Sequence, residues 1–424
     1  MIIKPFSLSG YSKSLAVFVF VFSLVASQNV IAQKSSELKY YDVVENKLPV
    51  IGRGFEESGN YFSRLPADIK GVVRKEVWDL GQNSSGIAVR FYSNSPVIGV
   101  KWELLNNFNM FHMTGAGIRG LDLYTLEGGE WLFVGTAQPY KIDGSNKICR
   151  AIARSKIEPL RDADGNQIGD GGREYLLYLP LYDGALKVEV GVDSTSSIGV
   201  PKNLDLVPQV GDKPIVFYGT SVTQGGCASR PGMSYTSIIE RKLHTETINL
   251  GFSGNGRMDK IMADKISTIK AKAFFIDCLA NCTYQIVKDS TEYFIKKLAG
   301  DNPNVPVFMV SNYAYPYQYL DKGFRSDLNA ENSLWYAYYL KFKKEGYKNL
   351  HFINVSGVKI KPEDLSAKAE DKSNEMVIPK YLGGKMETSA IGPDHEATVD
   401  GVHMTDLGFL RFADELIKMS KGKL

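Results

Sequence analysis

The amino-acid sequence predicts a two-domain chain, in which an all-β, jelly-roll-like sandwich is followed by a three-layer, flavodoxin-like α/β domain. One observation is length, because 424 residues exceed one ordinary domain and suffice for two hydrophobic cores. The other is a change of pattern along the chain. Short runs of alternating apolar and polar residues fill the first half, whereas apolar strands alternate with helical stretches in the second half.

The N-terminus has the pattern of a cleavable secretory signal. Lys4 and Lys13 are followed by an apolar run over 15–26 and by residues 30–32, which end in a small alanine. The apolar run is shorter than a membrane-spanning helix requires, which disfavours the alternative of an uncleaved anchor. We therefore predict a signal peptide over 1–32, export to the periplasm or the extracellular space, and no membrane attachment of the mature chain.

The first domain is predicted over 38–205 as an antiparallel β-sandwich. Its strands are expected at 86–92, 97–102, 120–124, 131–135, 175–181 and 186–192. Residues 162–170 resemble a calcium-binding loop in their Asp and Asn spacing. Gln167 and Arg173, however, occupy the positions where such a loop needs Gly and Glu, so a polar hairpin tip is predicted.

The second domain is predicted over 212–424, after a Pro-containing linker at 201–213. Strands are expected at 215–218, 247–250, 273–278, 305–311 and 350–355, with helices at 234–243, 291–298 and 326–345. Strands alternating with helices predict a parallel sheet covered on both faces. The charged segment 359–394 is expected to be either a functional rim or lid, or a solvated insertion.

Candidate chemistry begins at the end of the first α/β strand. Ser221 follows Gly219 and Thr220 and precedes the glycine pair at 225–226, a context that suits a nucleophile in a strand-to-helix turn. A serine in such a turn can equally be a helix cap or a phosphate contact. In a 2-1-3-4-5 strand order, the loops containing Gly254 and Asn281 flank the Ser221 loop, which assembles three segments into one site.

A second motif stands near the C-terminus, where Asp400 precedes His403 by three residues. This spacing allows the carboxylate to orient the imidazole, so that its other nitrogen can take a proton from Ser221. The alternatives are a surface Asp-His pair or a pair of metal ligands. The sequence contains five histidines without a second clustered pair, so we predict no metal or organic cofactor.

These blocks, in this order, resemble the four blocks of the SGNH (GDSL-like) hydrolases. The resemblance implies a catalytic triad of Ser221, His403 and Asp400, and an oxyanion hole formed by the amides of Ser221 and Gly254 with the Asn281 side chain. Residues 109–113 and 120–124 are similar to the β domain, carrying a GxDLY motif, that precedes the esterase domain in a bacterial subgroup of this family. The two resemblances together cover nearly all of the mature chain.

The sequence departs from the family pattern at two blocks. Thr220 stands where the family usually has Asp, at a position that is not catalytic. Residues 279–282 replace the usual Gly-x-Asn-Asp block, which leaves the assignment of Asn281 weaker than that of Ser221 or His403. For the β-domain residues His112, Arg119 and Asp122, two roles stay open: they reach the active site, or they stabilise their own domain.

The four cysteines, Cys149, Cys227, Cys278 and Cys282, are too few for a disulfide scaffold and form no convincing zinc site. Pairing of Cys227 with Cys278 or Cys282 and free structural thiols are both open alternatives. The formal net charge of +3 falls to +1 without Lys4 and Lys13. This near-neutral charge gives no electrostatic reason to expect nucleic acid or an anionic membrane as a partner.

The predicted function is that of an exported serine esterase that removes acetyl groups from a polysaccharide or oligosaccharide. Tyr313, Tyr315 and Tyr317 either pack against a sugar ring or belong to the packing of the rim. The enzymatic alternative is a lipid or thioester acylhydrolase. There are two further alternatives. One is a catalytically inactive carbohydrate-binding protein, and the other is a metal-dependent phosphoesterase that uses Asp277, Asp400 and His403. The sequence does not determine the oligomeric state.

Overall fold

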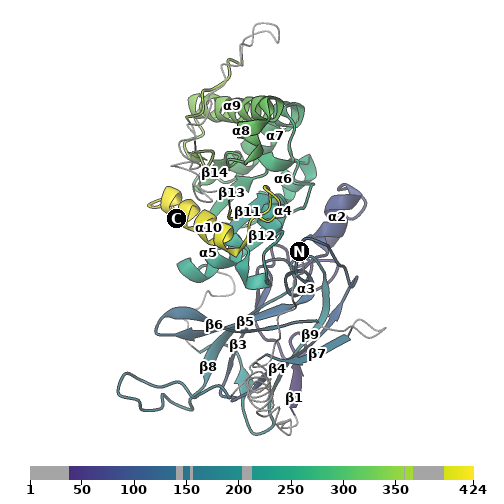
Figure 1. Ribbon diagram of the computed structural model, residues 1–424, viewed down its shortest axis with the longest axis vertical. Helices are drawn as coiled ribbons and strands as arrows, with labels where there is room; N and C mark the ends of the chain where they lie inside the picture. The colour runs from purple at the N-terminus through teal and green to yellow at the C-terminus, as the bar shows by residue number, and fades with distance from the viewer. Residues whose placement is uncertain (1–37, 140–146, 153–155, 203–212, 358, 366–395) are drawn as a thin grey trace, which may run out of the picture.

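The computed structural model describes residues 38–139, 147–152, 156–202, 213–357, 359–365 and 396–424. The predicted signal peptide over 1–32 lies outside these ranges, as do most of the linker at 201–213 and most of the segment 359–394. The chain forms an antiparallel β unit and a helix-covered parallel sheet, which lie one above the other in Figure 1. No helix in the described ranges combines the length and apolar character needed to cross a bilayer.

The β unit consists of two antiparallel sheets. One has the order β1 (Leu38–Asp42), β9 (Ala185–Asp193), β4 (Ile98–Leu104) and β7 (Lys147–Ala151). The other has the order β10 (Ile198–Gly199), β3 (Ala88–Ser93), β8 (Arg173–Tyr178), β5 (Leu121–Glu127) and β6 (Glu130–Ala137), with β2 (Val50–Ile51) paired to β3. Each of the six predicted strands is therefore present.

The inner faces of these two sheets share one core. Val89 and Leu123 of one sheet and Val100 and Val190 of the other belong to the same buried cluster. Side chains that alternate along a strand reach opposite faces, so every second residue enters this core. Each such apolar side chain contributes about 1.5–3 kcal/mol by leaving water. The antiparallel sandwich is confirmed, and its jelly-roll-like character stays a prediction.

The second unit is a five-stranded parallel sheet. Its order is β12 (Thr247–Gly251), β11 (Ile215–Gly219), β13 (Ala273–Asp277), β14 (Val307–Val310) and β15 (Leu350–Ile353). This is the predicted 2-1-3-4-5 order, with all neighbouring pairs parallel. The carboxyl ends of β11, β12 and β13 therefore meet at one edge, which is where such sheets bind ligands.

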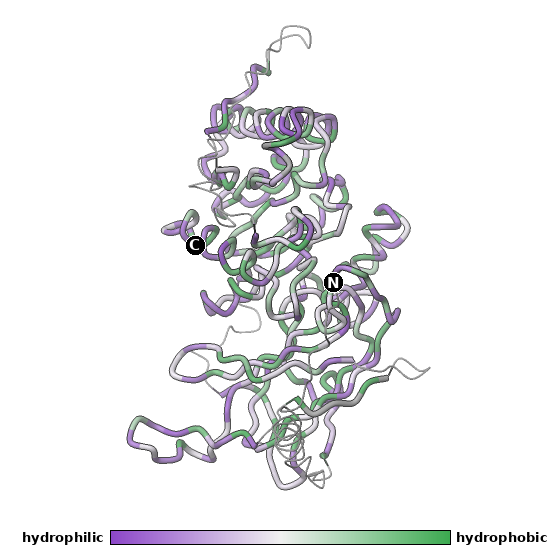
Figure 2. Tube along the Cα trace, in the orientation of Figure 1, coloured by the Kyte–Doolittle hydropathy of each residue, from purple (hydrophilic) through white to green (hydrophobic). Residues whose placement is uncertain are grey.

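Helices cover both faces of this parallel sheet. The short α4 (Ser221–Gln224) follows β11, and α5 (Tyr235–Leu243) and α10 (Asp406–Ser420) pack on one face. On the other face lie α6 (Lys260–Ile266), α7 (Tyr284–Asp301) and α9 (Lys322–Lys344). Figure 2 shows hydrophilic and hydrophobic colours alternating along α9, as a helix with one buried side requires.

A segment of the N-terminal region also covers the parallel sheet. The 3-10 helix η1 (Ala67–Ile69) and α2 (Lys75–Gly81) lie between β2 and β3 in the chain. Ile69 and Val77 nevertheless belong to the same buried cluster as Val216 of β11. In Figure 1, α2 accordingly stands beside the helical unit. The two units therefore share a hydrophobic core. The predicted domain boundary at 205–212 did not anticipate that residues of the first unit pack against the second.

Arg64 fixes this segment to the end of β12. Its guanidinium is buried and donates to the carbonyls of Asn249 (3.1 Å) and Gly251 (2.7 Å), and to those of Leu80 (2.6 Å) and Asn83 (2.9 Å). Burial lowers the pKa of Arg64 to about 9. These four carbonyls accept hydrogen bonds from the guanidinium and so replace the water lost on burial. The cation therefore lies where the chain turns toward the Gly254 loop.

Asp122, in the predicted GxDLY motif, connects the two units more directly. Its carboxylate is fully buried and lies 2.8 Å from Arg230, and it accepts the backbone N–H of Gly232 at 2.9 Å. Thr136 donates to its second oxygen at 2.6 Å, and Arg230 also reaches the Tyr124 hydroxyl at 2.5 Å. Burial raises the pKa of Asp122, and Arg230 opposes that rise. Asp122 therefore has a structural role that differs from both open alternatives, since it stabilises the contact between the two units.

We expect Arg230→Met to lower the free energy of unfolding by about 3–5 kcal/mol, because it leaves the Asp122 carboxylate buried without its cation. Urea unfolding measures the loss. The double variant Asp122→Asn with Arg230→Met should be more stable than Arg230→Met alone. The control is Lys242→Met, which removes an exposed ion pair with Asp414 and should cost less than about 1 kcal/mol. Equal losses in Arg230→Met and Lys242→Met would contradict the assignment.

Candidate active site

Ser221 lies at the first position of α4, immediately after β11. Thr220 caps the helix, because its hydroxyl accepts the Val222 amide at 3.2 Å, and Gly225 ends the helix with a φ of 102°. The first amides of a helix have no partner within the helix and favour negative charge. Thr220, which departs from the family's usual Asp, therefore has a structural role as cap. Ser221 itself is 7% exposed.

The structure brings Ser221, His403 and Asp400 together. Ser221 Oγ lies 2.9 Å from His403 Nε2, and His403 Nδ1 lies 2.7 Å from Asp400 Oδ2. The other oxygen of Asp400 accepts the backbone amides of Val402 (3.0 Å) and His403 (2.8 Å). The three-residue spacing thus lets one carboxylate hold both the ring and the backbone of the histidine.

The charge on Asp400 is favoured by these contacts. Partial burial raises its pKa, but hydrogen bonds from the His403 ring and from the two backbone amides outweigh burial, so that the pKa lies below its ordinary value. A charged carboxylate accepts a hydrogen bond from the Nδ1–H group, which leaves the lone pair of Nε2 facing Ser221. This arrangement can accept the hydroxyl proton of Ser221.

A buried network of hydrogen bonds connects the nucleophile turn to the end of β13. The carboxylate of Asp277, at the end of β13, accepts from the Tyr235 hydroxyl at 3.1 Å and from Thr223 Oγ1 at 3.4 Å. Thr223 in turn accepts the Thr220 amide at 3.2 Å. Burial raises the pKa of Asp277 to about 6. Because this carboxylate contacts neither Ser221 nor His403 directly, we treat it as a positioning residue.

The β unit also contacts the nucleophile turn. The buried Tyr182 hydroxyl donates to the Ser221 carbonyl at 3.3 Å. A Cβ at Gly226 would lie 2.8 Å from that hydroxyl and 3.2 Å from Cδ2 of His403. A larger residue here would therefore force the Tyr182 hydroxyl to shift, since the turn passes between the tyrosine and the imidazole. Sequence reasoning missed Tyr182, because no local pattern distinguishes it from other buried tyrosines.

The two predicted oxyanion loops flank Ser221 at the same sheet edge, as the strand order requires. Gly254 is exposed and has a φ of 69°, with open space where a Cβ would lie. The Asn281 side-chain oxygen accepts the Gly256 amide at 3.3 Å, which connects the two loops. With its oxygen occupied in this way, the Asn281 amide nitrogen remains as a donor.

A loop of the β unit reaches the active site through His112. Its ring centroid lies 5.7 Å from that of His403 and 4.7 Å from that of Phe111, whose side chain is completely exposed. His112 therefore takes the first of its two predicted roles. Arg119 takes the second role, because its guanidinium donates to Asn107, within the β unit, at 2.5 Å.

The prediction that tyrosines of this loop pack against a sugar ring is corrected by the burial of two of them. Tyr313 and Tyr315 are only 3% and 4% exposed and pack against each other, with ring centroids 4.5 Å apart. The Tyr313 hydroxyl donates to the Val402 carbonyl, beside His403. Their rings belong to the core between the parallel sheet and α10, so the rim-packing alternative describes them. The side chain of Tyr317, in α8 (Tyr317–Leu320), lies outside the described residues.

Cys227, Cys278 and Cys282 are buried free thiols, and the side chain of Cys149 lies outside the described residues. The predicted alternative of free thiols therefore applies to these three. Burial, assisted by the negative charge of Asp400, raises the pKa of Cys227 to about 12. At neutral pH, Cys227 is therefore a neutral thiol beside the triad.

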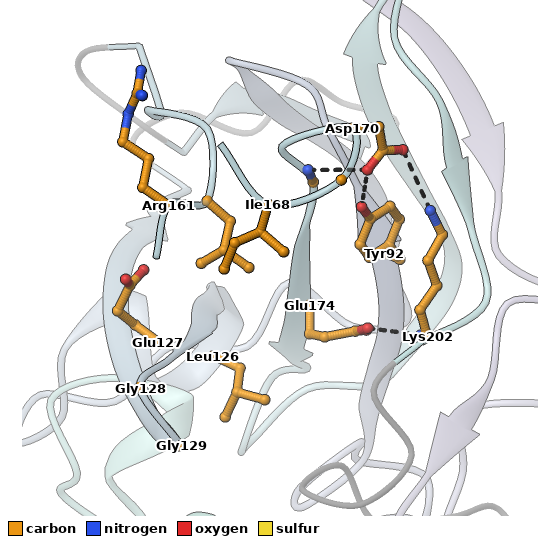
Figure 3. Close-up of a pocket in the computed structure, with 13 residues that line it drawn as sticks. Tyr92, Leu126, Glu127, Gly128, Gly129, Arg161, Ile168, Asp170, Glu174 and Lys202 are labelled. Atoms are coloured by element: carbon orange, nitrogen blue, oxygen red, sulfur yellow. Dashed lines mark hydrogen bonds and ion pairs between the residues drawn. The ribbon is translucent and has the colours of Figure 1, made fainter. Parts of the chain in front are cut away.

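A cavity of about 800 Å³ lies in the β unit (Figure 3). The hairpin that includes Arg161 and Ile168 forms one side, and the turn after Leu126 forms another. Within the hairpin, Asp162 accepts the backbone amides of Asp164 and Asn166. This self-contained turn agrees with the predicted polar hairpin tip, and the cavity includes no member of the candidate triad.

Comparison with known proteins agrees with this geometry. Residues 212–386 match the GDSL-like lipase/acylhydrolase family, and residues 38–198 match the GxDLY family, described as the N-terminus of SGNH-hydrolase-type esterases. The chain is an SGNH (GDSL-like) hydrolase. It belongs to the subgroup with a GxDLY domain, and membership places it among the esterases. The resemblance predicted from the sequence is confirmed.

Solved structures resemble the SGNH hydrolase over most of its length. A GDSL-like lipase from Bacteroides ovatus is 29% identical, with a TM-score of 0.73 over 91% of this chain and 98% of that one. A salicylyl acyltransferase from a tetracycline biosynthetic pathway is 15% identical, with a TM-score of 0.58 over 90% and 96%. A family two carbohydrate esterase from Cellvibrio japonicus is 9% identical, with a TM-score of 0.50 over 91% and 98%. No curated protein matches the chain.

The raised pKa of Asp277 predicts a specific pH dependence of stability. The folded hydrolase holds this proton more tightly than the unfolded chain, so a stability contribution present below about pH 4 is lost as the pH rises through about 6. Asp277→Asn should remove this part of the pH dependence in urea unfolding between about pH 4 and 7. Asp289→Asn, on the exposed surface of α7, is the control and should keep the wild-type slope. Parallel slopes in wild type and Asp277→Asn would refute the prediction.

Proposed function

We propose that this SGNH hydrolase is an exported serine esterase that acts through a Ser221, His403 and Asp400 triad on acetyl esters of carbohydrates. The observation that carries the proposal is the continuous pair of contacts, 2.9 Å from Ser221 to His403 and 2.7 Å from His403 to Asp400. These distances lie within hydrogen-bond reach, as a nucleophile, its base and an orienting carboxylate require. Their place at the carboxyl edge of the parallel sheet further supports the assignment.

In the proposed reaction, Ser221 Oγ attacks the ester carbonyl while its proton passes to His403 Nε2. Asp400 stabilises the imidazolium that forms. The tetrahedral intermediate then collapses, and the departing alcohol takes the proton from His403. A water molecule, deprotonated by His403, attacks the acyl-enzyme, and the carboxylic acid leaves with Ser221 restored.

The oxyanion of the tetrahedral intermediate needs donors on the other side of Ser221. We assign this role to the backbone amides of Ser221 and Gly254 and to the side-chain amide of Asn281. The contact from Gly256 to the Asn281 oxygen supports the assignment, because it fixes the orientation of the side-chain amide. Each donor of this kind typically stabilises a transition state by about 3 kcal/mol.

A carbohydrate ester is the substrate class that the surroundings of the triad support best. Phe111 is completely exposed beside His112, and an apolar ring held in water next to a reactive site is suited to packing against a sugar ring. The predicted signal peptide over 1–32 supports export to the periplasm or the extracellular space, where the enzyme would encounter polysaccharides. Phe111 thus takes the sugar-packing role that was one of the two alternatives for Tyr313, Tyr315 and Tyr317.

The first test of this proposal is Ser221→Ala. Hydrolysis of 4-nitrophenyl acetate in the presence of EDTA should fall by a factor of about 10³ or more in this variant, because the nucleophile is lost. Ser194→Ala, in an exposed turn of the β unit, is the matched control and should retain activity. Full activity in Ser221→Ala would remove the serine from its role. If EDTA abolished the activity of the wild type, the hypothesis of a metal-dependent phosphoesterase would be favoured. If the wild type hydrolysed no acyl ester, the hypothesis of an inactive carbohydrate-binding protein would be favoured.

The substrate class is tested by Phe111→Ala. The KM for acetylated xylo-oligosaccharides should rise by a factor of about 2 to 12, since the loss of one aromatic packing contact costs about 0.5–1.5 kcal/mol. Hydrolysis of 4-nitrophenyl acetate, which has no sugar ring, should change little. Val72→Ala, which truncates another exposed apolar side chain, is the control. An unchanged KM for the oligosaccharide, or faster turnover of long-chain acyl esters than of acetylated sugars, would argue for the lipid alternative.

A further inference from the structure

Three metal-binding side chains converge beside the candidate triad. His112 comes from a loop of the β unit, Cys227 from the loop after α4, and His403 from the C-terminal loop. One ligand atom from each, a ring nitrogen or the thiol sulfur, lies within 4.8 Å of the other two. No single segment of the sequence contains two of these residues, so the cluster exists only because the two units meet here.

The chemistry of the three donors selects one kind of ion. Two imidazoles and a thiolate are soft or borderline ligands, which favour Zn²⁺ over Mg²⁺ or Ca²⁺. Ligand atoms around tetrahedral zinc lie about 3.4 Å apart, given metal–ligand lengths of about 2.0–2.3 Å. The observed cluster therefore needs side-chain shifts of about 1 Å to close on an ion.

Two of the three side chains can make such shifts with little loss. Nδ1 of His112 is buried and has no hydrogen-bond partner within the described part of the chain. The Cys227 thiol, a weak donor, donates to the His112 carbonyl at 3.5 Å. An unpartnered buried nitrogen costs free energy, which a metal ligand would recover. The side chain of His403 is 22% exposed, which leaves the ion access to solvent and to a water as fourth ligand.

We propose that His112, Cys227 and His403 form an inhibitory zinc site, in which the ion and the esterase reaction compete for His403. On binding, the Cys227 thiol releases its proton to solvent and the sulfur bonds the metal. Both nitrogens of His403 are used in the apo protein, one by Ser221 and the other by Asp400. Whichever nitrogen binds zinc, one contact of the triad is broken. The inhibitory consequence rests on the proposed function, whereas the site itself does not.

The experiment adds Co²⁺ as a spectroscopic substitute for Zn²⁺ to purified, metal-free full-length protein. A sulfur-to-cobalt charge-transfer band should saturate at one equivalent, and Zn²⁺ should displace it. Zn²⁺ should inhibit 4-nitrophenyl acetate hydrolysis over the same concentration range, and excess EDTA should restore the rate. Absence of a band at one equivalent would overturn the site.

Cys227→Ser supplies the matched test, because it removes the sulfur ligand and leaves the triad intact. This variant should lose the band, bind Co²⁺ at least tenfold more weakly and resist Zn²⁺ to the same degree, with its activity in EDTA unchanged. Cys282→Ser removes a buried thiol elsewhere and should behave as wild type. His112→Asn keeps the thiol and should also weaken binding at least tenfold, while His244→Asn, at the end of α5, should not. A band that persists in Cys227→Ser would overturn the proposal.

The two proposals fail in different ways. A protein that shows the cobalt band but hydrolyses no ester would refute the proposed esterase function and retain the metal site. A protein that hydrolyses esters but shows no band, or is inhibited equally in wild type and Cys227→Ser, would retain the esterase and refute the metal site.

Discussion

The contact of the Asp122 carboxylate with Arg230 and the Gly232 amide is the constraint on which the rest of the structure depends. Asp122 belongs to a strand of the β unit, whereas Arg230 follows Ser221 by nine residues. A carboxylate with no exposed surface is tolerated only where cations and donors replace the lost water. The β unit therefore cannot separate from the segment after the nucleophile without leaving this charge unpaired.

The active site is consequently built from both units and not from the α/β unit alone. Tyr182 bonds the Ser221 carbonyl, and Ser85 donates to the Gln224 carbonyl at 2.6 Å. Gln224 in turn bonds Leu181 through its amide nitrogen (3.1 Å) and Ser253 through its oxygen (3.0 Å). These contacts fix the turn that presents the nucleophile, in keeping with the need for a reactive group to be positioned before its substrate arrives.

Two buried charged residues at this junction have hydrogen-bond partners in both units. Glu240 of α5 accepts the Tyr178 hydroxyl at 2.8 Å and the Thr247 amide at 2.9 Å, and burial raises its pKa to about 7. Arg64 reaches the end of β12 through carbonyls only. Satisfied buried groups of this kind give orientation as well as stability, because each bond is lost if the surfaces shift.

The sequence by itself determined the two fold classes and the Ser221, Asp400 and His403 blocks. These depend on periodicity, on short spacings and on strand ends, all of which are local properties of the chain. Only the tertiary structure decided that η1 and α2 cover the parallel sheet, that Tyr182 reaches the nucleophile turn and that His112 reaches His403. It also decided that Tyr313 and Tyr315 are core residues while Phe111 is exposed. An aromatic side chain in a loop has the same local sequence signal in either place, because its burial depends on surfaces brought together from distant parts of the chain.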